Sequence, residues 1–226
     1  PIASYFVWKL YSRFNNKEFL QEAYPSLDRW YQWWSATDPE GHPRRDGNED
    51  GLYEWGADYK YEKTDNHRMK RWAAHWESGL DDSPMWDDIK MKGIHMNLNS
   101  IWLNSLRALD SLMMSKIAEE LGKEKEAKSF KNNYNQLKKL INNKLWNEKE
   151  EMYLSRYWDG KWEADQGVPT MTPANFTVLL AGIPSEKRAE KIVNSHLLNP
   201  DEFWGEYVIP TINKNHPDYK APYTYW

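Results

Sequence analysis

Apolar residues recur at spacings of three and four along most of the chain, which is the period of an amphipathic helix. This pattern predicts helices over Ile2–Phe14, Lys17–Trp34, Leu98–Leu121, Glu124–Leu145, Pro173–Ala181 and Glu186–Leu198. Gly122 is suited to end the third of these, and Ser185 to cap the last. The first two form a helical hairpin, and the third and fourth are expected to lie antiparallel because so few residues separate them.

Long stretches without this period join the helices. A loop runs from Pro39 to about Asn66, and a second, acidic loop is WESGLDDSPMWDD, Trp76–Asp88. The segment MYLSRYWDGKWEA alternates and turns at Asp159–Gly160, which predicts a small β-hairpin. The sequence shows no alternation of strand and helix and has neither a GxGxxG nor a GxxxxGKS loop, so a nucleotide-binding sheet is not expected. Helical hairpins joined by long loops predict an all-α fold, an α/α toroid.

Composition narrows the classes of function. With 226 residues the chain is expected to form one domain, and 30 Lys+Arg against 34 Asp+Glu leave a net charge of −4 with no basic stripe for nucleic acid. The absence of cysteine excludes disulfides and thiolate chemistry but leaves the compartment open, cytoplasmic, periplasmic or secreted. No apolar run reaches the ~18 residues of a membrane span, and the N-terminus lacks the features of a signal peptide. Both ends are abrupt, so we expect a fragment that lacks N- and C-terminal parts of its domain.

The 14 Trp and 14 Tyr are unusually many. Most are expected to fill a helical core. Aromatic faces also stack on sugars while their polar atoms form hydrogen bonds. The rings in polar loops, Trp55, Trp76, Trp86 and Trp204, are therefore the better candidates for a binding cleft.

The loop DGNEDGLYE has the spacing of the first part of an EF-hand. Oxygen-bearing side chains stand at its first, third, fifth and ninth positions, Asp46, Asn48, Asp50 and Glu54, and Leu52 would offer its carbonyl at the seventh. The twelfth position is Ala57, so the usual bidentate Glu is missing and a remote carboxylate would have to close the shell. We expect a structural calcium ion; the alternative is a turn capped by its own side chains.

The acidic loop carries the candidate catalytic group. Its Gly and Pro cannot continue a helix, so Asp81 and Asp82 lie on an irregular segment, where catalytic groups often occur. Adjacent side chains on an extended segment point opposite ways, so only one of the two can face a given substrate atom. Burial beside Trp76 or Trp86 would raise a carboxyl pKa, as a general acid requires. The alternative is a cap or a surface charge.

Several motifs together carry a family resemblance. ESGLDDSP, with DGNEDGLYEWG before it and GVPTMTPANF, FWGEYVIPTI and YTYW after it, resembles glycoside hydrolase family 63, which is related to the trehalases of family 37. The resemblance covers essentially the whole chain. It implies an (α/α)6 barrel, an exo-acting hydrolase that inverts an α-linked glucosyl or mannosyl bond in an oligosaccharide or small glycoside, and a structural calcium ion on the 46–54 loop.

The same resemblance assigns the site residues. Asp81 is the implied general acid; Trp76 and Trp86 would wall the cleft, Glu77, Gly79 and Asp82 would shape the loop, and Trp204 lies in a substrate-binding stretch. The general base of the family is a Glu that follows a segment resembling the final YTYW, so it is expected beyond Trp226. Glu206 is a weaker substitute within the chain.

Two other classes of function stay open. A carbohydrate-binding α/α toroid without catalysis would keep the cleft and the calcium loop, and the presence of the second Glu beyond Trp226 would distinguish it from an enzyme. A helical interaction scaffold would not explain the acidic, aromatic segment Glu77–Pro84.

Overall fold

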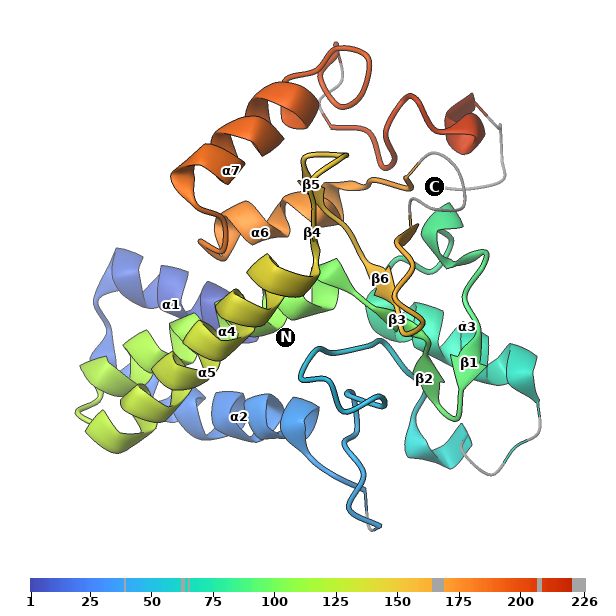
Figure 1. The fold of residues 1–226 in the computed structure, drawn as a ribbon. Coiled ribbons are helices and arrows are strands. Elements are labelled where there is room, and N and C mark those ends of the chain that lie inside the picture. Colours follow the sequence, from blue (N-terminus) through green and yellow to red (C-terminus); the bar gives the residue numbers. More distant parts are fainter. Residues whose placement is uncertain (39, 62–63, 65, 164–168, 207–208, 221–226) are drawn as a thin grey trace.

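The computed structural model describes residues 1–38, 40–61, 64, 66–163, 169–206 and 209–220, without the side chains of Tyr59 and Lys220. The final YTYW and parts of the GVPTMTPANF and FWGEYVIPTI motifs lie outside the described residues. Helices dominate the described part, and its few strands are two residues long (Figure 1). No helix among the described residues is both long and apolar enough to cross a membrane.

Two long helices form the centre of the molecule. α4 (Ile101–Glu120) and α5 (Glu124–Lys144) lie side by side and antiparallel, joined by a turn at Gly122 (Figure 1). α4 buries nearly all of its faces, whereas α5 buries only the stripe Phe130, Tyr134, Leu137 and Ile141. α4 is thus a core helix and α5 an amphipathic cover.

A second hairpin packs on the first. α1 (Ala3–Phe14) turns at Asn15, which is left-handed, and α2 (Lys17–Ser35) starts where the Asn16 side chain accepts a hydrogen bond from the Phe19 amide at 3.0 Å. Both helices contact α4. The predicted helices Ile2–Phe14, Lys17–Trp34 and Glu124–Leu145 are confirmed to within a residue at each end.

Three other predicted helices are shorter or divided. Leu98–Asn99 are strand β3 rather than helix, because they pair with β6 (Arg156–Tyr157) before Ser100 caps α4. The stretch from Pro173 is a 3-10 turn (Pro173–Phe176) followed by α6 (Thr177–Leu180). α7 (Glu186–Ile192) begins at its predicted cap Ser185 and continues as a π-helical turn, Val193–Leu197.

One helix was not predicted. α3 (His67–Ser78) occupies a stretch for which the apolar pattern gave no helix, and it places Trp76 on a helix rather than in a loop. It is followed by a 3-10 turn, Pro84–Trp86. A further 3-10 turn, Tyr59–Tyr61, precedes it, and another, Pro217–Lys220, lies near the C-terminus.

Short antiparallel strand pairs connect parts of the loops. β1 (Met91–Lys92) pairs with β2 (His95–Met96), and β4 (Trp146–Asn147) pairs with β5 (Met152–Tyr153), all antiparallel. The predicted turn at Asp159–Gly160 is present: Gly160 has φ +88°, and Arg156 bridges to Trp162 across it. A small β-hairpin is therefore confirmed, although its strands also pair elsewhere.

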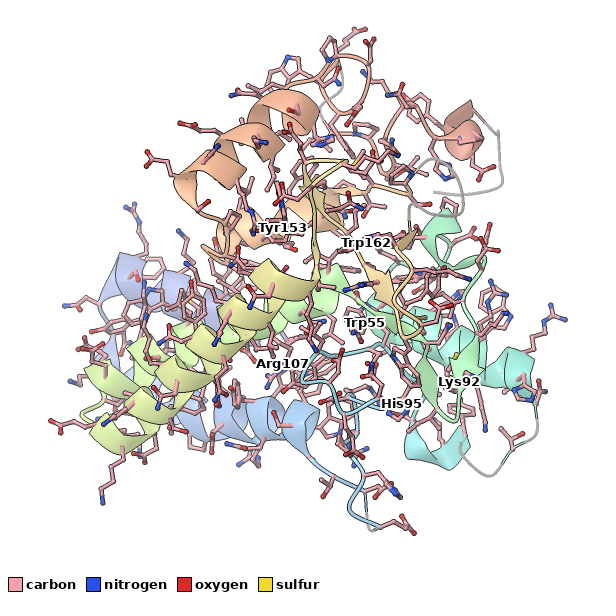
Figure 2. The ribbon with its side chains drawn as sticks, in the orientation of Figure 1. Trp55, Lys92, His95, Arg107, Tyr153 and Trp162 are labelled. Atoms are coloured by element: carbon pink, nitrogen blue, oxygen red, sulfur yellow. The ribbon has the colours of Figure 1, made fainter. Side chains whose placement is uncertain are left out.

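Tryptophans fill the core between α3 and α4. Trp55, labelled in Figure 2, is 3% exposed and meets Trp34 and Trp102 with ring centroids 5.9 and 5.6 Å away. Trp86 belongs to the same cluster and has no exposed surface. For these two rings the core interpretation is correct, and Trp55 is not a cleft residue.

Candidate active site

The end of α3 sets the course of the acidic loop. Gly79 has φ +70°, the left-handed conformation that ends helices and that glycine adopts at little cost, and its N–H donates to the Trp76 carbonyl at 3.2 Å. The Ser78 hydroxyl then accepts from the Leu80 amide at 3.1 Å. The chain therefore reverses within two residues of the helix and brings Asp81 back alongside α3.

Asp81 lies on the wall of a pocket. The pocket has a volume of about 470 Å³ and is lined by Arg68, Arg71, Trp72, His75, Asp81, Asp82, Ser83 and Asp87. Asp81 is half-buried and Asp82 is exposed. Burial, followed by the charge of Arg71, lowers the pKa of His75, which favours the neutral imidazole beside the acid loop. A half-buried carboxyl at an open pocket can exchange a proton with a bound molecule.

Hydrogen bonds to backbone carbonyls hold the loop in this position. Arg71 Nη2 donates to the Trp86 carbonyl at 2.7 Å and to the Asp87 carbonyl at 3.0 Å. From the inner side, Trp86 Nε1 donates to the Leu80 carbonyl at 2.8 Å. A ring without exposed surface cannot stack on a sugar, so the expectation that Trp86 walls the cleft is wrong. Trp86 supports the loop from within.

Glu77 points away from this pocket. Its carboxylate forms a bidentate ion pair with Arg45: Nε donates to Oε1 at 3.1 Å and to Oε2 at 2.9 Å, and Nη2 donates to Oε1 at 2.5 Å. Oε2 also accepts a hydrogen bond from the Gly56 amide at 2.9 Å. Arg45 has no exposed surface. Removing one partner of such a buried pair leaves an uncompensated charge, so the pair joins the 44–57 loop firmly to α3.

An exposed aromatic pair lies on α3, and one of its rings reaches the pocket of Asp81. Trp72 and Trp76, one helical turn apart, are 41% and 57% exposed, and their ring centroids are 6.2 Å apart. Trp72 lines the pocket directly. Sequence reasoning missed Trp72, Arg71 and His75. The signal that could have found them is their spacing of three and four residues from Arg68 to Trp76, once that stretch is taken as a helix.

Of the C-terminal residues, Thr211 and Ile212 lie next to the acidic loop, whereas Trp204 and Glu206 line neither of its pockets. Asp82 and Ser83 share a small pocket of about 40 Å³ with Thr211 and Ile212. Trp204 is 45% exposed but is not among the residues that line either pocket, and its carbonyl accepts from Lys214 Nζ at 2.7 Å. Glu206 is exposed as well.

The five candidate calcium ligands share one turn, but several of their oxygens already have partners. Asp46 accepts from the amides of Asp50 and Gly51 at 2.9 and 3.0 Å. Asp50 accepts from the Leu52 amide and from Asn99, and Lys144 Nζ lies 3.1 Å from its Oδ2. In the part of the chain that the structure describes, no three His, Asp or Glu side chains are grouped to hold a metal.

Two features of the same turn favour a cation. Glu54 is fully buried between the Gly47 amide and Trp158 Nε1, and burial, with the charges of Asp46 and Asp50, raises its pKa to about 9. The Asn48 Oδ1 is buried without a hydrogen-bond partner. Leu52 is fully buried. Lys144 Nζ occupies one oxygen of Asp50, so a calcium ion in this turn would have to displace it, and the calcium site stays a prediction.

Comparison with known proteins identifies the family. The sequence matches the model of the mannosylglycerate hydrolase MGH1-like glycoside hydrolase domain over residues 1–226. It is 23% identical over 216 residues to a fission yeast protein (Schizosaccharomyces pombe) named "Probable mannosyl-oligosaccharide glucosidase", covering 92% of this chain and 24% of that protein. The chain spans 38% and 24% of the two curated relatives it matches.

Solved structures show the same fold. The family 63 mannosylglycerate hydrolase from Thermus thermophilus, in complex with glucose, superposes with a TM-score of 0.68 at 18% identity, over 96% of this chain and 55% of that one. Neutral trehalase Nth1 from Saccharomyces cerevisiae superposes with a TM-score of 0.62 at 15% identity, over 93% of this chain and 44% of the trehalase chain. These matches confirm the (α/α)6 toroid and the resemblance to family 63. Since the family match runs over residues 1–226, the chain belongs to the MGH1-like glycoside hydrolases.

Proposed function

We propose that the chain supplies the general acid of an exo-acting glycoside hydrolase that inverts an α-glucosidic or α-mannosidic bond, and that this acid is Asp81. The observation that carries the proposal is the placement of Asp81, half-buried on a pocket wall, two residues after the left-handed end of α3 and beside Trp72. Membership of a glycoside hydrolase family supports the class of reaction.

In this mechanism the Asp81 carboxyl donates its proton to the glycosidic oxygen as the bond to the anomeric carbon breaks. Water attacks that carbon from the opposite face and loses a proton to a second carboxylate, about 6.5–9.5 Å from the first, which leaves room for the water. We place this base beyond Trp226. Asp82 neighbours the acid in sequence, and the exposed Glu206 lines neither pocket beside the loop, so both are poorer choices.

The names of two relatives support the choice of sugar. One is named a mannosyl-oligosaccharide glucosidase and another a mannosylglycerate hydrolase solved with glucose. We therefore propose an α-linked glucoside or mannoside, an oligosaccharide or a small glycoside. Trp72, which shares the pocket with Asp81, and the neighbouring Trp76 provide exposed faces on which a pyranose can stack.

The test is Asp81→Asn in the full-length polypeptide. It keeps size and most hydrogen bonds but removes the transferable proton, so hydrolysis of a disaccharide should fall by roughly 10²–10⁴, the usual contribution of general acid catalysis. Aryl glycosides with good leaving groups need less protonation and should lose much less. Asp82→Asn is the matched control, since it lines the same pocket, and it should lose less than Asp81→Asn on both substrates.

Three results decide between the alternatives. Full activity of a folded Asp81→Asn enzyme on a disaccharide would refute Asp81 as the acid. Sugar binding without hydrolysis by the wild-type full-length protein would favour the non-catalytic toroid. Proton NMR of the first product identifies the anomer, and an α-anomer from an α-glycoside would contradict inversion.

A further inference from the structure

A second, strongly acidic pocket lies on the other side of the loop that follows Asp81. It has a volume of about 130 Å³, and its titratable lining groups are Asp87, Asp88, Tyr157, Glu163, His216 and Asp218. None of the described residues that line it is Lys or Arg. Four carboxyl groups thus face one small space from three separate stretches of the chain, with no Lys or Arg among the described residues that line it.

Glu163 is the unusual member of this pocket. It is 8% exposed, and no described residue makes a hydrogen bond of good geometry to either carboxylate oxygen. The hydroxyl and the backbone N–H of Ser155 lie near this carboxyl and favour its charged form, while burial opposes it. A buried carboxylate with so little hydrogen bonding is costly, and a cation is one of the few species that offset that cost.

His216 does not supply the missing positive charge. Its Nδ1 accepts a hydrogen bond from the Asp218 amide at 3.2 Å and lies 3.5 Å from the Asp218 carboxylate, and Nε2 lies 3.1 Å from Thr170 Oγ1. Burial lowers the pKa of His216, against the opposing charges of Asp218 and Asp87. Burial also raises the pKa of Tyr157, which keeps the phenol neutral. None of the described lining groups therefore supplies a fixed positive charge.

We propose that this pocket binds a partly hydrated divalent cation of the calcium or magnesium class, with Glu163 as its buried ligand. Hard cations prefer carboxylate and water oxygens, and magnesium in particular keeps several waters and takes only one or two carboxylates. The volume of about 130 Å³ corresponds to roughly four waters at about 30 Å³ each. Since no three acidic or histidine side chains are grouped to hold a metal among the described residues, most ligands of the ion would have to be water.

The position of the ion gives it a structural role. Pro84, Met85 and Asp87 line the pocket from the acid loop, and His216 and Asp218 line it from the C-terminal part of the described chain. A cation shared by these walls would hold the loop that carries Asp81 against residues 163 and 216–218. This site is separate from the 46–54 turn, and the inference does not depend on the proposed reaction.

The test is titration of the metal-stripped full-length protein with CaCl2 and with MgCl2, followed by calorimetry and by thermal unfolding. Glu163→Gln should lower the affinity of one site by roughly tenfold or more, because it replaces the buried charge by an amide of the same shape. Asp46→Ala, which alters only the other turn, should leave that site intact. Asp88→Asn, on an exposed residue at the pocket, should weaken binding without a risk to folding.

Each titration result either supports or contradicts a cation site at Glu163. Loss of one site in Glu163→Gln and its weakening in Asp88→Asn, with retention in Asp46→Ala, supports the proposal. If Glu163→Gln fails to fold, the Asp88→Asn titration decides alone. Unchanged binding in the folded pocket variants, or a wild-type protein with no cation site besides the one that Asp46→Ala removes, would overturn it.

Discussion

At the scale of single residues, burial and partners separate carboxyl groups that look alike in the sequence. Glu77 and Asp81 stand four positions apart, yet the oxygens of Glu77 are bound by Arg45 and Gly56 while Asp81 faces an open pocket. The sequence pointed to Asp81 through its motif and through the Gly and Pro around it. It could not place Trp86, because an aromatic residue in an irregular segment can turn either to the core or to the cleft.

The 46–54 turn offers a prediction at this scale. We propose that calcium binds there only when it displaces the Lys144 ammonium from Asp50, where the two atoms are 3.1 Å apart. Lys144→Gln removes this competitor, so added calcium should raise its melting temperature more than that of the wild type, since a ligand bound only by the native state stabilises it.

The measurement is thermal unfolding of metal-stripped protein with and without calcium. Both proteins should carry Glu163→Gln, so that the acidic pocket does not contribute to the shift. Asp46→Ala should abolish the rise. Identical melting curves with and without calcium, in both proteins, would mean that the turn is capped by its own side chains alone.

At the scale of elements, α3 was the main omission. Its sequence HRMKRWAAHWES carries few aliphatic residues, and its exposed face bears Trp72 and Trp76, so the apolar pattern did not show a buried stripe. By contrast, α2 and α5 have a regular stripe and were predicted nearly residue by residue. Periodicity finds helices whose faces are sorted by polarity, and it fails where aromatic residues stand on the open face.

The end of α3 allows a matched test. Gly79→Ala places a Cβ in the left-handed conformation, which costs about 1–2 kcal/mol, while no atom lies within 4 Å of the new Cβ. Gly122→Ala, at the end of α4, has the same conformation, φ +72° against +70°, and the same open space. Both variants should lose similar stability in chemical denaturation.

Only Gly79→Ala should affect function, because relaxing its strain shifts the loop that carries Asp81. We expect kcat of the full-length enzyme to fall several-fold in Gly79→Ala and to stay near the wild-type value in Gly122→Ala. Equal kcat values in the two variants, at equal loss of stability, would show that the geometry of the α3 end does not position the acid.

At the scale of the whole molecule, helix periods and motif order were enough to predict the α/α toroid. They did not predict how the loops pack against the helices. Loop positions depend on contacts between residues far apart in sequence, such as Arg45 with Glu77 or Trp158 with Glu54. Such pairs leave no local pattern. One face of α1, Ile2, Phe6, Leu10 and Phe14, is 36–70% exposed at a spacing of four residues, as expected for a helix that can pack on another in a toroid.

The last prediction concerns the 226-residue chain by itself. It spans 55% of the solved mannosylglycerate hydrolase, and we place the base for water activation beyond Trp226. An inverting mechanism with an acid but no base has no group to take the proton from water, so this chain alone should show no turnover of a disaccharide. The full-length polypeptide should hydrolyse the same substrate.

A matched pair tests the reason for that loss. A full-length protein in which the second carboxylate is replaced by an amide should be folded and equally inactive, and added azide should restore turnover of activated glycosides by attacking in place of water. Robust hydrolysis by the 226-residue chain, at a rate near that of the full-length protein, would require both carboxylates within it. The search for the base would then return to the carboxyl groups of the described pockets.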